Sequence, residues 1–404
     1  MAASDPAEKA IAYALRTPPA KPVPWYLRWT LGKNRYDHVE LAGAFGDFGT
    51  LIPFVVGYIA VMKIDPLGIL FTFGLCEIAV GLFYKTPVPV QPMKAIGGAA
   101  IASGGAISPG MILGAGLFTG LFWFLAGATG TVNLATRLAA RPITHGIVLG
   151  LGLMFVTEGV GMMSTMPWLG GVGLLITFLL LTYPRFPAMF ALLILGAAAA
   201  WFLDPIHVAQ LLSTPPAFRL PEFTSTDISP NDMIAGILVL AIPQIPLTIG
   251  NAVIAIRAEN NELFPDRPVS DRMMAVSQGL MNLFSAPFGG IPLCHGAGGM
   301  AGHVRFGART GGSLVMLGVI MIALALFFSD SVGLLFRIFP KAILGVILFF
   351  AGAELAVTIR GIGDRKDDIY VMLVVAGFAM WNMGAAFLAG IVLYQALQRR
   401  WFKL

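Results

Sequence analysis

Charged and amide side chains occur at a few positions inside a sequence that is otherwise strongly apolar. The stretch PVPVQPMKAIGG, residues 87–98, places Gln91 and Lys94 among three prolines and ahead of small residues. An ionised lysine inside an apolar segment is costly unless it binds a partner, so such a lysine is a candidate functional group. A lysine ammonium and a glutamine amide both donate hydrogen bonds, which is the chemistry that binds an anion.

Asp47 is a second charged group in an apolar segment, within the sequence GDFGT. A carboxylate repels an anion unless it is protonated or paired, so we interpret Asp47 as a proton carrier or as an ion-pair partner of Lys94. A purely structural ion pair would explain both charges equally well. Thr50 is a better direct ligand for an anion, because its hydroxyl donates a hydrogen bond and adds no charge.

A third group of polar side chains lies in IPQIPLTIGNA, residues 242–252. Gln244, Thr248 and Asn251 are spaced by four and three residues, which puts them on one face of a continuous helix. A lipid-facing asparagine would be costly, so we expect this face to point inward. The three side chains would bind either the substrate or neighbouring helices.

Cys294, His295 and Gly296 begin a segment of small residues, CHGAGGMAGH. We expect side-chain and backbone donors to converge there on a substrate. His295 could also gain a proton at low pH and couple anion entry to a proton, or it could cap buried carbonyl groups. Cys294, His295 and His303 lack a second cluster of ligands, so we predict no metal and no cofactor.

The amino-acid composition indicates whether these groups are surrounded by water or by lipid. The 404 residues are 57% hydrophobic and 12% charged, with a net charge of +5, and a soluble domain carries about twice this share of charged residues. The basic residues lie in short loops between apolar segments, which is typical of membrane orientation and argues against a nucleic-acid partner. The two cysteines both lie in apolar segments, so no disulfide framework is expected. The sequence predicts an all-α polytopic membrane protein in a lipid bilayer.

The apolar segments form two groups of seven. We predict a cytoplasmic tail at 1–38 with an interfacial turn near Trp25 and Tyr26, a first transmembrane repeat at 39–203, an extracytoplasmic linker at 204–232, a second repeat at 233–398 and a cytoplasmic tail at 399–404. The predicted spans are 40–62, 67–83, 88–104, 110–130, 143–163, 167–183, 186–203, 233–256, 272–288, 291–303, 311–329, 332–358, 367–381 and 383–398. Residues 330–345 could instead form an interfacial helix, so 12 to 14 spans remain open.

The number of segments decides the symmetry. With the N-terminus in the cytoplasm, alternation places most lysines and arginines inside, as the positive-inside rule requires. An odd number of segments per repeat gives the two repeats opposite orientations. The sequence therefore predicts a seven-plus-seven inverted repeat.

Corresponding segments of the two repeats are interrupted in the same way. Residues 87–104 and 288–303 each begin with an extended, proline-containing stretch and continue in small residues. We interpret each as a strand followed by a half-helix that begins near the middle of the membrane. Two half-helix N-termini that meet from opposite sides would form an anion site.

Four motifs carry a family resemblance: GAFGDFGTLIPF at 43–54, PVQPMKAI at 89–96, IPQIPLTIGNA at 242–252 and PLCHGAGGMAGHVRFGARTGG at 292–312. Together the chain resembles the molybdate transporter branch of the SulP sulfate permease superfamily, over essentially its whole membrane portion. The resemblance implies core and gate domains, an oxyanion held between the broken helices, and no C-terminal STAS domain.

The resemblance implies a secondary active transporter and not an enzyme. It would import molybdate by alternating access, as a proton-linked symporter or driven by the gradient of the anion itself. The alternatives are a sulfate or broader oxyanion permease and, further off, a nucleobase transporter, an anion channel or an intramembrane enzyme. Motifs that the enzyme would need, such as HExxH or GxSxG, are missing from the sequence. We expect a location in a bacterial plasma membrane, with both termini in the cytoplasm. The sequence leaves the oligomeric state undecided, and a homodimer is one alternative.

Overall fold

The computed structural model describes residues 29–31, 33–103, 105–132, 140–180, 188–224, 228–357, 359, 362 and 365–401. The residues expected to form an interfacial turn, Trp25 and Tyr26, lie outside this part of the chain. The described part of the chain is mainly helical, as predicted, and its only strands are four short ones.

The first repeat follows a short antiparallel hairpin of β1 (Trp29–Leu31) and β2 (Asn34–Tyr36). Its elements are α2 (His38–Ala44), η2 (Phe45–Asp47), α3 (Phe48–Ala60), α4 (Pro66–Tyr84), β3 (Gln91–Pro92), α5 (Lys94–Ala102), α6 (Pro109–Thr129), α8 (Arg141–Met163), α9 (Pro167–Leu180) and α10 (Ala188–Leu203).

The second repeat begins with a helical span, Pro230–Leu263, in which two π-helical turns interrupt the α-helix. Its elements are α12 (Pro230–Ala235), η4 (Gly236–Ala241), α13 (Ile242–Thr248), η5 (Ile249–Ile254), α14 (Ala255–Leu263), α15 (Asp271–Ser285), η6 (Ala286–Phe288), β4 (Leu293–Cys294), α16 (Ala297–Arg305), α17 (Gly312–Ile338), α18 (Lys341–Val357), α19 (Lys366–Trp381) and α20 (Met383–Gln398).

The helices vary in how they could cross a membrane. Among the described residues, five helices are long and apolar enough to span it, and two bent helix pairs bring the number to seven. The other apolar segments are shorter helices or the two interrupted segments. Each interrupted segment is extended first and helical afterwards, as the sequence predicted.

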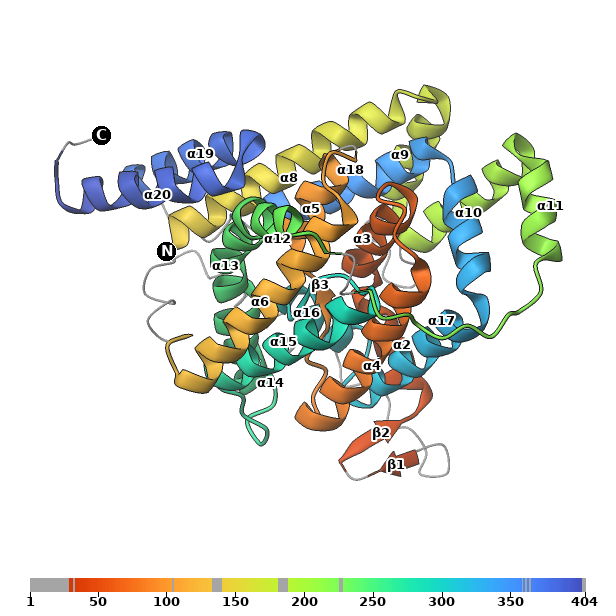
Figure 1. Ribbon diagram of the computed structural model, residues 1–404, viewed down its shortest axis with the longest axis horizontal. Coiled ribbons are helices and arrows are strands. Elements are labelled where there is room, and N and C mark those ends of the chain that lie inside the picture. Colours follow the sequence, from red (N-terminus) through yellow and green to blue (C-terminus); the bar gives the residue numbers. More distant parts are fainter. Residues whose placement is uncertain are drawn as a thin grey trace.

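The helices pack in reciprocal pairs across the two repeats. Helix α4 packs along α17, and α15, the counterpart of α4, packs along α6, the counterpart of α17. Helix α8 packs along α18, and these two helices are counterparts of each other in the two repeats. This reciprocity is the packing that an inverted repeat predicts (Figure 1).

Glycines allow the closest of these helix contacts. A Cβ atom on Gly152 of α8 would lie 2.6 Å from the Gly352 carbonyl oxygen of α18, and one on Gly352 would lie 2.5 Å from the Gly152 carbonyl oxygen. Real Cβ atoms do not approach a carbonyl so closely, so a larger residue at either position would push the two helices apart.

One predicted division between spans is wrong, and the predicted linker is partly helical. The segments predicted at 311–329 and 332–358 divide later, because α17 runs to Ile338 and the chain turns at Pro340, which cannot continue a helix. The predicted linker at 204–232 contains a helix, α11 (Pro205–Ser213), which begins after an N-cap by Asp204. Beyond α11 the chain is extended, and the amides of Ala217 and Arg219 donate to carbonyl groups of α17.

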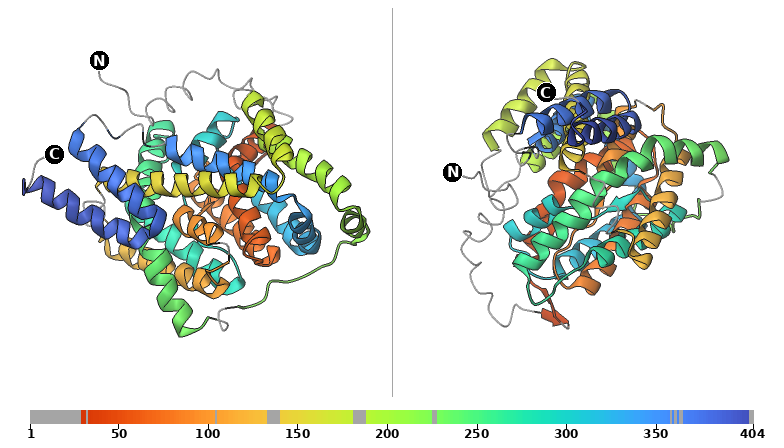
Figure 2. Two further views of the ribbon diagram at one scale, coloured as in Figure 1. Left: turned by 90° about the horizontal axis from the view of Figure 1, so that it is seen from above. Right: turned by 90° about the vertical axis from the view of Figure 1, so that its left-hand side faces the viewer.

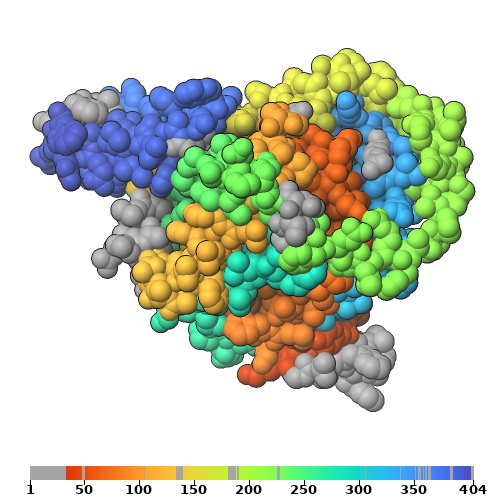
Figure 3. Space-filling view, in the orientation of Figure 1, coloured from red at the N-terminus to blue at the C-terminus, as the bar shows by residue number. Residues whose placement is uncertain are grey.

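The arrangement has a packed body and a projecting pair of helices. Figure 1 shows β3 and α16 in the middle of the molecule, and Figure 3 shows α19 and α20 projecting from one side of it. The views in Figure 2 show the extended part of the linker passing over the outside of the molecule. The largest cluster of buried apolar residues surrounds the two interrupted segments, which therefore lie in the interior.

Candidate anion site

The two interrupted segments meet in the interior through their strands. Strands β3 and β4 pair antiparallel, with Gln91 opposite Cys294 and Pro92 opposite Leu293. The Met93 amide adds a hydrogen bond of 2.8 Å to the Pro292 carbonyl oxygen. Because each strand leads directly into its half-helix, this pairing brings the N-termini of α5 and α16 together. The first turn of a helix has amide groups without intrahelical acceptors, so both ends can hold negative charge.

At the start of α5, a glutamine side chain occupies these amides. Gln244 Oε1 accepts hydrogen bonds from the amides of Ala95 at 2.8 Å and Ile96 at 3.4 Å. Its Nε2 donates to Thr248 Oγ1 at 2.9 Å. Both side chains are 1% exposed. The structure therefore brings these two predicted site residues together, as a buried cap on α5.

Lys94 is the first residue of α5 and is only 8% exposed. Within the described part of the chain, its ammonium makes no hydrogen bond and no ion pair. The ion pair with Asp47 that the sequence suggested is therefore not formed in this structure. An enclosed cation without an internal partner can bind an external anion.

Asp47 instead holds Gln91. Gln91 Nε2 donates to Asp47 Oδ1 at 2.6 Å, and both side chains are buried. The Asp47 carboxylate also lies beside the first turn of α16, since its Oδ2 is 2.7 Å from where a Cβ atom on Gly299 would be. The amide donor of Gln91 is thus used inside the protein, and a titratable group lies at the α16 terminus.

The start of α16 is tightly enclosed on one side and open on the other. A Cβ atom on Gly296 would overlap Gln91 Oε1 and would lie 3.1 Å from Asn251 Nδ2. Gly298, two residues later, is exposed, and a Cβ atom there would meet nothing within 4 Å. The amides of Ala297 and Gly298 donate to no described residue. These amides and the partly exposed Asn251 side chain are therefore available to a ligand.

His295 and Cys294 are engaged by the protein. The two ring nitrogens of His295 lie 2.8 Å from the Pro89 carbonyl oxygen and 2.7 Å from Ser277 Oγ. Cys294 is buried, and its thiol contacts the Pro92 carbonyl oxygen at 3.7 Å. In this structure both residues fix the strand crossing, and neither ring nitrogen of His295 is left for an anion.

Helix α3 carries one residue that the sequence predicted for the site and one near α5 that it did not. Thr50 lies in the first turn of α3, and its side chain is outside the described residues. Tyr58, farther along α3, has a fully buried hydroxyl with no hydrogen-bond partner in the described part of the chain. This hydroxyl is 3.0 Å from where a Cβ atom on Gly97 of α5 would be. Sequence reasoning had no signal for Tyr58, because an aromatic residue on an apolar helix is ordinary.

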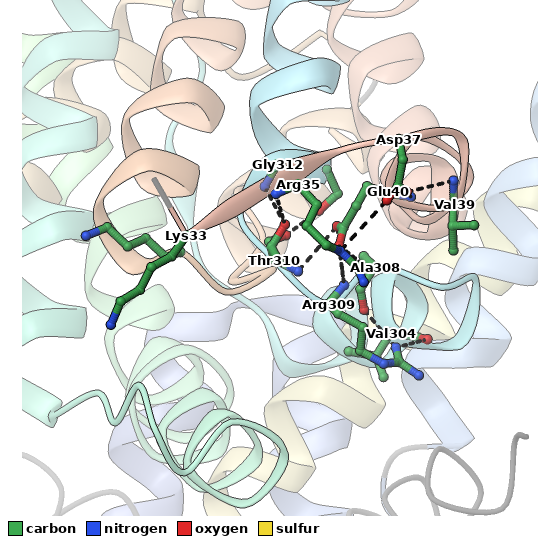
Figure 4. A network of polar contacts seen from close by, with 12 residues as sticks. Lys33, Arg35, Asp37, Val39, Glu40, Val304, Ala308, Arg309, Thr310 and Gly312 are labelled. Atoms are coloured by element: carbon green, nitrogen blue, oxygen red, sulfur yellow. Dashed lines mark hydrogen bonds and ion pairs between the residues drawn. The ribbon is translucent and has the colours of Figure 1, made fainter. Parts of the chain in front are cut away.

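The far end of α16 is fixed by a buried carboxylate (Figure 4). Glu40 Oε1 accepts from Arg35 Nη2 at 2.8 Å and from the Arg309 amide at 3.1 Å, and its Oε2 accepts from the Thr310 amide at 3.3 Å. Partial burial lowers the pKa of the Arg309 guanidinium, and the negative charge of Glu40 opposes this shift. This network ties the N-terminal hairpin to the loop after α16 and holds the half-helix in place.

Comparisons with known proteins agree with this architecture. A family model described as "Molybdate transporter of MFS superfamily" matches residues 39–155 and 236–355, one part in each repeat. The chain is 34% identical to molybdate transporter 2 of Arabidopsis thaliana, covering 89% of this chain and 87% of the relative. It is 30% identical to molybdate transporter 1 of the same plant, covering 89% and 88%. It is 28% identical to molybdate transporter 1 of Chlamydomonas reinhardtii, covering 87% and 90%.

Solved structures of anion transporters share the fold. The transmembrane domain of the cyanobacterial bicarbonate transporter BicA has a TM-score of 0.59 at 16% identity, covering 87% of this chain and 96% of that one. Murine Slc26a9 in the inward-facing state has a TM-score of 0.65 at 11% identity, covering 100% and 76%. The predicted seven-plus-seven inverted repeat is confirmed by this likeness.

The resemblance stated from the sequence is confirmed for the molybdate transporters, while membership in the SulP superfamily stays a prediction, because the solved structures show a shared fold alone. The expectation of a transporter and not an enzyme is also confirmed, because the matching family and relatives are transporters. The broken segments, the reciprocal packing and the matches over both repeats lead to one conclusion: this chain belongs to the molybdate transporter family.

Proposed function

We propose that this protein imports molybdate across a membrane as a secondary transporter that works by alternating access, with proton coupling. The observation that carries the proposal is Lys94, an enclosed cation at the start of a half-helix that makes no ion pair within the described part of the chain. The names of the relatives supply the substrate. The solved anion transporters named above share the fold.

The proposed site lies between the two half-helix N-termini. Lys94 supplies a positive charge from the α5 side, and the amides of Ala297 and Gly298 supply backbone donors from the α16 side. Asn251 adds a neutral amide donor beside Gly296. A tetrahedral dianion accepts hydrogen bonds on every oxygen, so converging donors around one cation suit it.

Asp47 is the proposed proton carrier. A dianion at the α16 terminus would lie near the Asp47 carboxylate, and two negative charges at one site repel each other. Protonation of Asp47 would remove this repulsion, so anion binding and proton binding would favour each other. His295 is the weaker candidate of the two that the sequence suggested, because both of its ring nitrogens already have partners.

The orientation of the chain in the membrane, the identity of that membrane and the oligomeric state stay predictions. We propose cytoplasmic termini, because Arg257 near the end of the first span of the second repeat, and Arg267 and Arg272 after it, lie on the side where the positive-inside rule places basic residues. A bacterial plasma membrane and a homodimer also stay predictions, and the relatives above are plant and algal proteins.

The proposal is tested by uptake of trace molybdate into proteoliposomes, with and without excess sulfate and with and without an inward proton gradient. Lys94→Gln should lower uptake by about tenfold or more, because a charge-assisted hydrogen bond contributes ~1.5–3 kcal/mol. The matched control is Lys341→Gln, which removes an exposed lysine that also starts a helix. Equal uptake by the two variants would refute the role of Lys94, and strong inhibition by sulfate would indicate a broader oxyanion permease.

A further inference from the structure

An apolar cleft lies outside the anion site, between α4, α15 and the end of α6. It has a volume of about 800 Å³, and its wall is formed almost entirely by aliphatic and aromatic side chains. Figure 1 shows these three helices next to one another at the front of the molecule. No part of the proposed transport mechanism uses this cleft.

The cleft opens on the outer surface of the molecule. Phe83 of α4 and Leu280 of α15 form part of its lining and are 62% and 51% exposed. Along α15 the lining runs from Arg272 to Phe284, about 18 Å at 1.5 Å per residue. The hydrocarbon core of a bilayer is ~30 Å thick, so this length corresponds to about one leaflet and fits one acyl chain.

One end of the cleft carries a cation. Arg272 Nε donates to the Gly127 carbonyl oxygen at 3.0 Å, and its Nη2 donates to the Ala128 carbonyl oxygen at 2.7 Å. These two bonds hold the guanidinium against the end of α6. Its Nη1 donates to no described residue. A guanidinium with remaining donors at the end of an apolar cleft matches a phosphate group attached to an acyl chain.

The same end of the cleft is connected to the strand crossing. Tyr84 Oη lies 2.8 Å from Ser277 Oγ, and Ser277 Oγ lies 2.7 Å from a ring nitrogen of His295. The other ring nitrogen of His295 contacts the Pro89 carbonyl oxygen, just before β3. Tyr84 and Ser277 both line the cleft, so its occupant would touch side chains that hold the two interrupted segments together.

We propose that this cleft binds one acyl chain of an anionic phospholipid, with the phosphate on Arg272, and that the bound lipid supports transport through Tyr84 and Ser277. The lipid comes from the leaflet that contacts the end of α6 and the start of α15. The effect on transport rests on the proposed function, whereas lipid binding itself does not.

The binding test is native mass spectrometry of the full-length protein from vesicles of phosphatidylcholine and phosphatidylglycerol. The wild-type protein should retain phosphatidylglycerol preferentially, and Arg272→Gln should lower this retention about fivefold, because a basic residue near an anionic lipid contributes ~1 kcal/mol. The matched control is Arg141→Gln, which removes an exposed arginine at the start of α8.

A second variant tests the apolar part of the cleft without changing the arginine. Ala79→Trp would fill the cleft from its exposed rim, and Ala323→Trp, at an exposed position of α17 outside the cleft, is its control. Only Ala79→Trp should lose lipid.

Equal retention of phosphatidylglycerol in Arg272→Gln and Arg141→Gln, or in the two tryptophan variants, would overturn the site. Uptake that is independent of phosphatidylglycerol while retention is intact would overturn the coupling alone.

Discussion

The N-termini of α5 and α16 are equivalent by the repeat but differ in the side chain that approaches them. The first helical segment of each repeat reaches the half-helix of the other: Gln244 bonds to the amides of α5, and Asp47 lies beside the first turn of α16. One group is a neutral amide and the other is a carboxylate. The backbone symmetry thus leaves the proposed site asymmetric: α5 would contribute a lysine, and α16 would contribute backbone amides beside a titratable acid.

The largest expected effect concerns the close approach at α16. Gly296→Ala should nearly abolish uptake, because the added methyl group would overlap Gln91 Oε1 and push this buried side chain out of its hydrogen bond with Asp47. Gly298→Ala should fold and insert normally, because nothing lies within 4 Å of its added methyl group. Size-exclusion profiles and molybdate uptake of the two variants measure the difference, and normal uptake by Gly296→Ala would show that the crossing is looser than described.

The second-largest effect is expected at Asp47, the acidic side chain that lies beside the N-terminus of α16 and has no acidic counterpart beside α5 among the described residues. Asp47→Asn keeps an acceptor for Gln91 but cannot bind a proton. Wild-type uptake should rise as the external pH falls, because protonated Asp47 no longer repels the dianion, while uptake by Asp47→Asn should be independent of pH. The comparison is made in proteoliposomes with a fixed internal pH. If uptake by Asp47→Asn still responded to the proton gradient, the proton would be carried by a group other than Asp47.

A smaller effect is expected from the neutral cap of α5. Gln244→Ala removes the acceptor for the Ala95 and Ile96 amides, and losing such a cap costs about 1 kcal/mol of stability. Thermal unfolding in detergent should show a lower midpoint, with uptake reduced less than in Lys94→Gln. Thr248→Ala is the control, since it removes only the partner of Gln244 Nε2. If Gln244→Ala lost uptake as completely as Lys94→Gln, Gln244 would be a direct ligand.

The smallest effect is expected from Asn251. A neutral hydrogen bond contributes ~0.5–1.5 kcal/mol, so Asn251→Ala should raise the molybdate concentration for half-maximal uptake by about two- to tenfold. The maximal rate should change little, because the amide borders Gly296 without a partner in the described structure. An unchanged concentration dependence would place the anion away from Asn251.

The sequence was informative about the main features of the site. A lysine and a glutamine among prolines, followed by small residues, were sufficient to predict the broken segment that carries Lys94. The spacing of Gln244 and Thr248 correctly indicated one helix face, since the two side chains are hydrogen-bonded. Their roles could not be predicted, because the amides that Gln244 caps lie about 150 residues earlier in the chain.

The sequence by itself determined the membrane setting, the two interrupted segments and the inverted repeat, because hydropathy, proline and glycine act locally along the chain. Only the tertiary structure decided which polar groups are paired. The crossing of β3 and β4 leaves Asp47 bound to Gln91 and leaves Lys94 without an ion pair among the described residues. Hydrogen-bond partners depend on contacts between distant segments, and these are fixed only when the two repeats pack together.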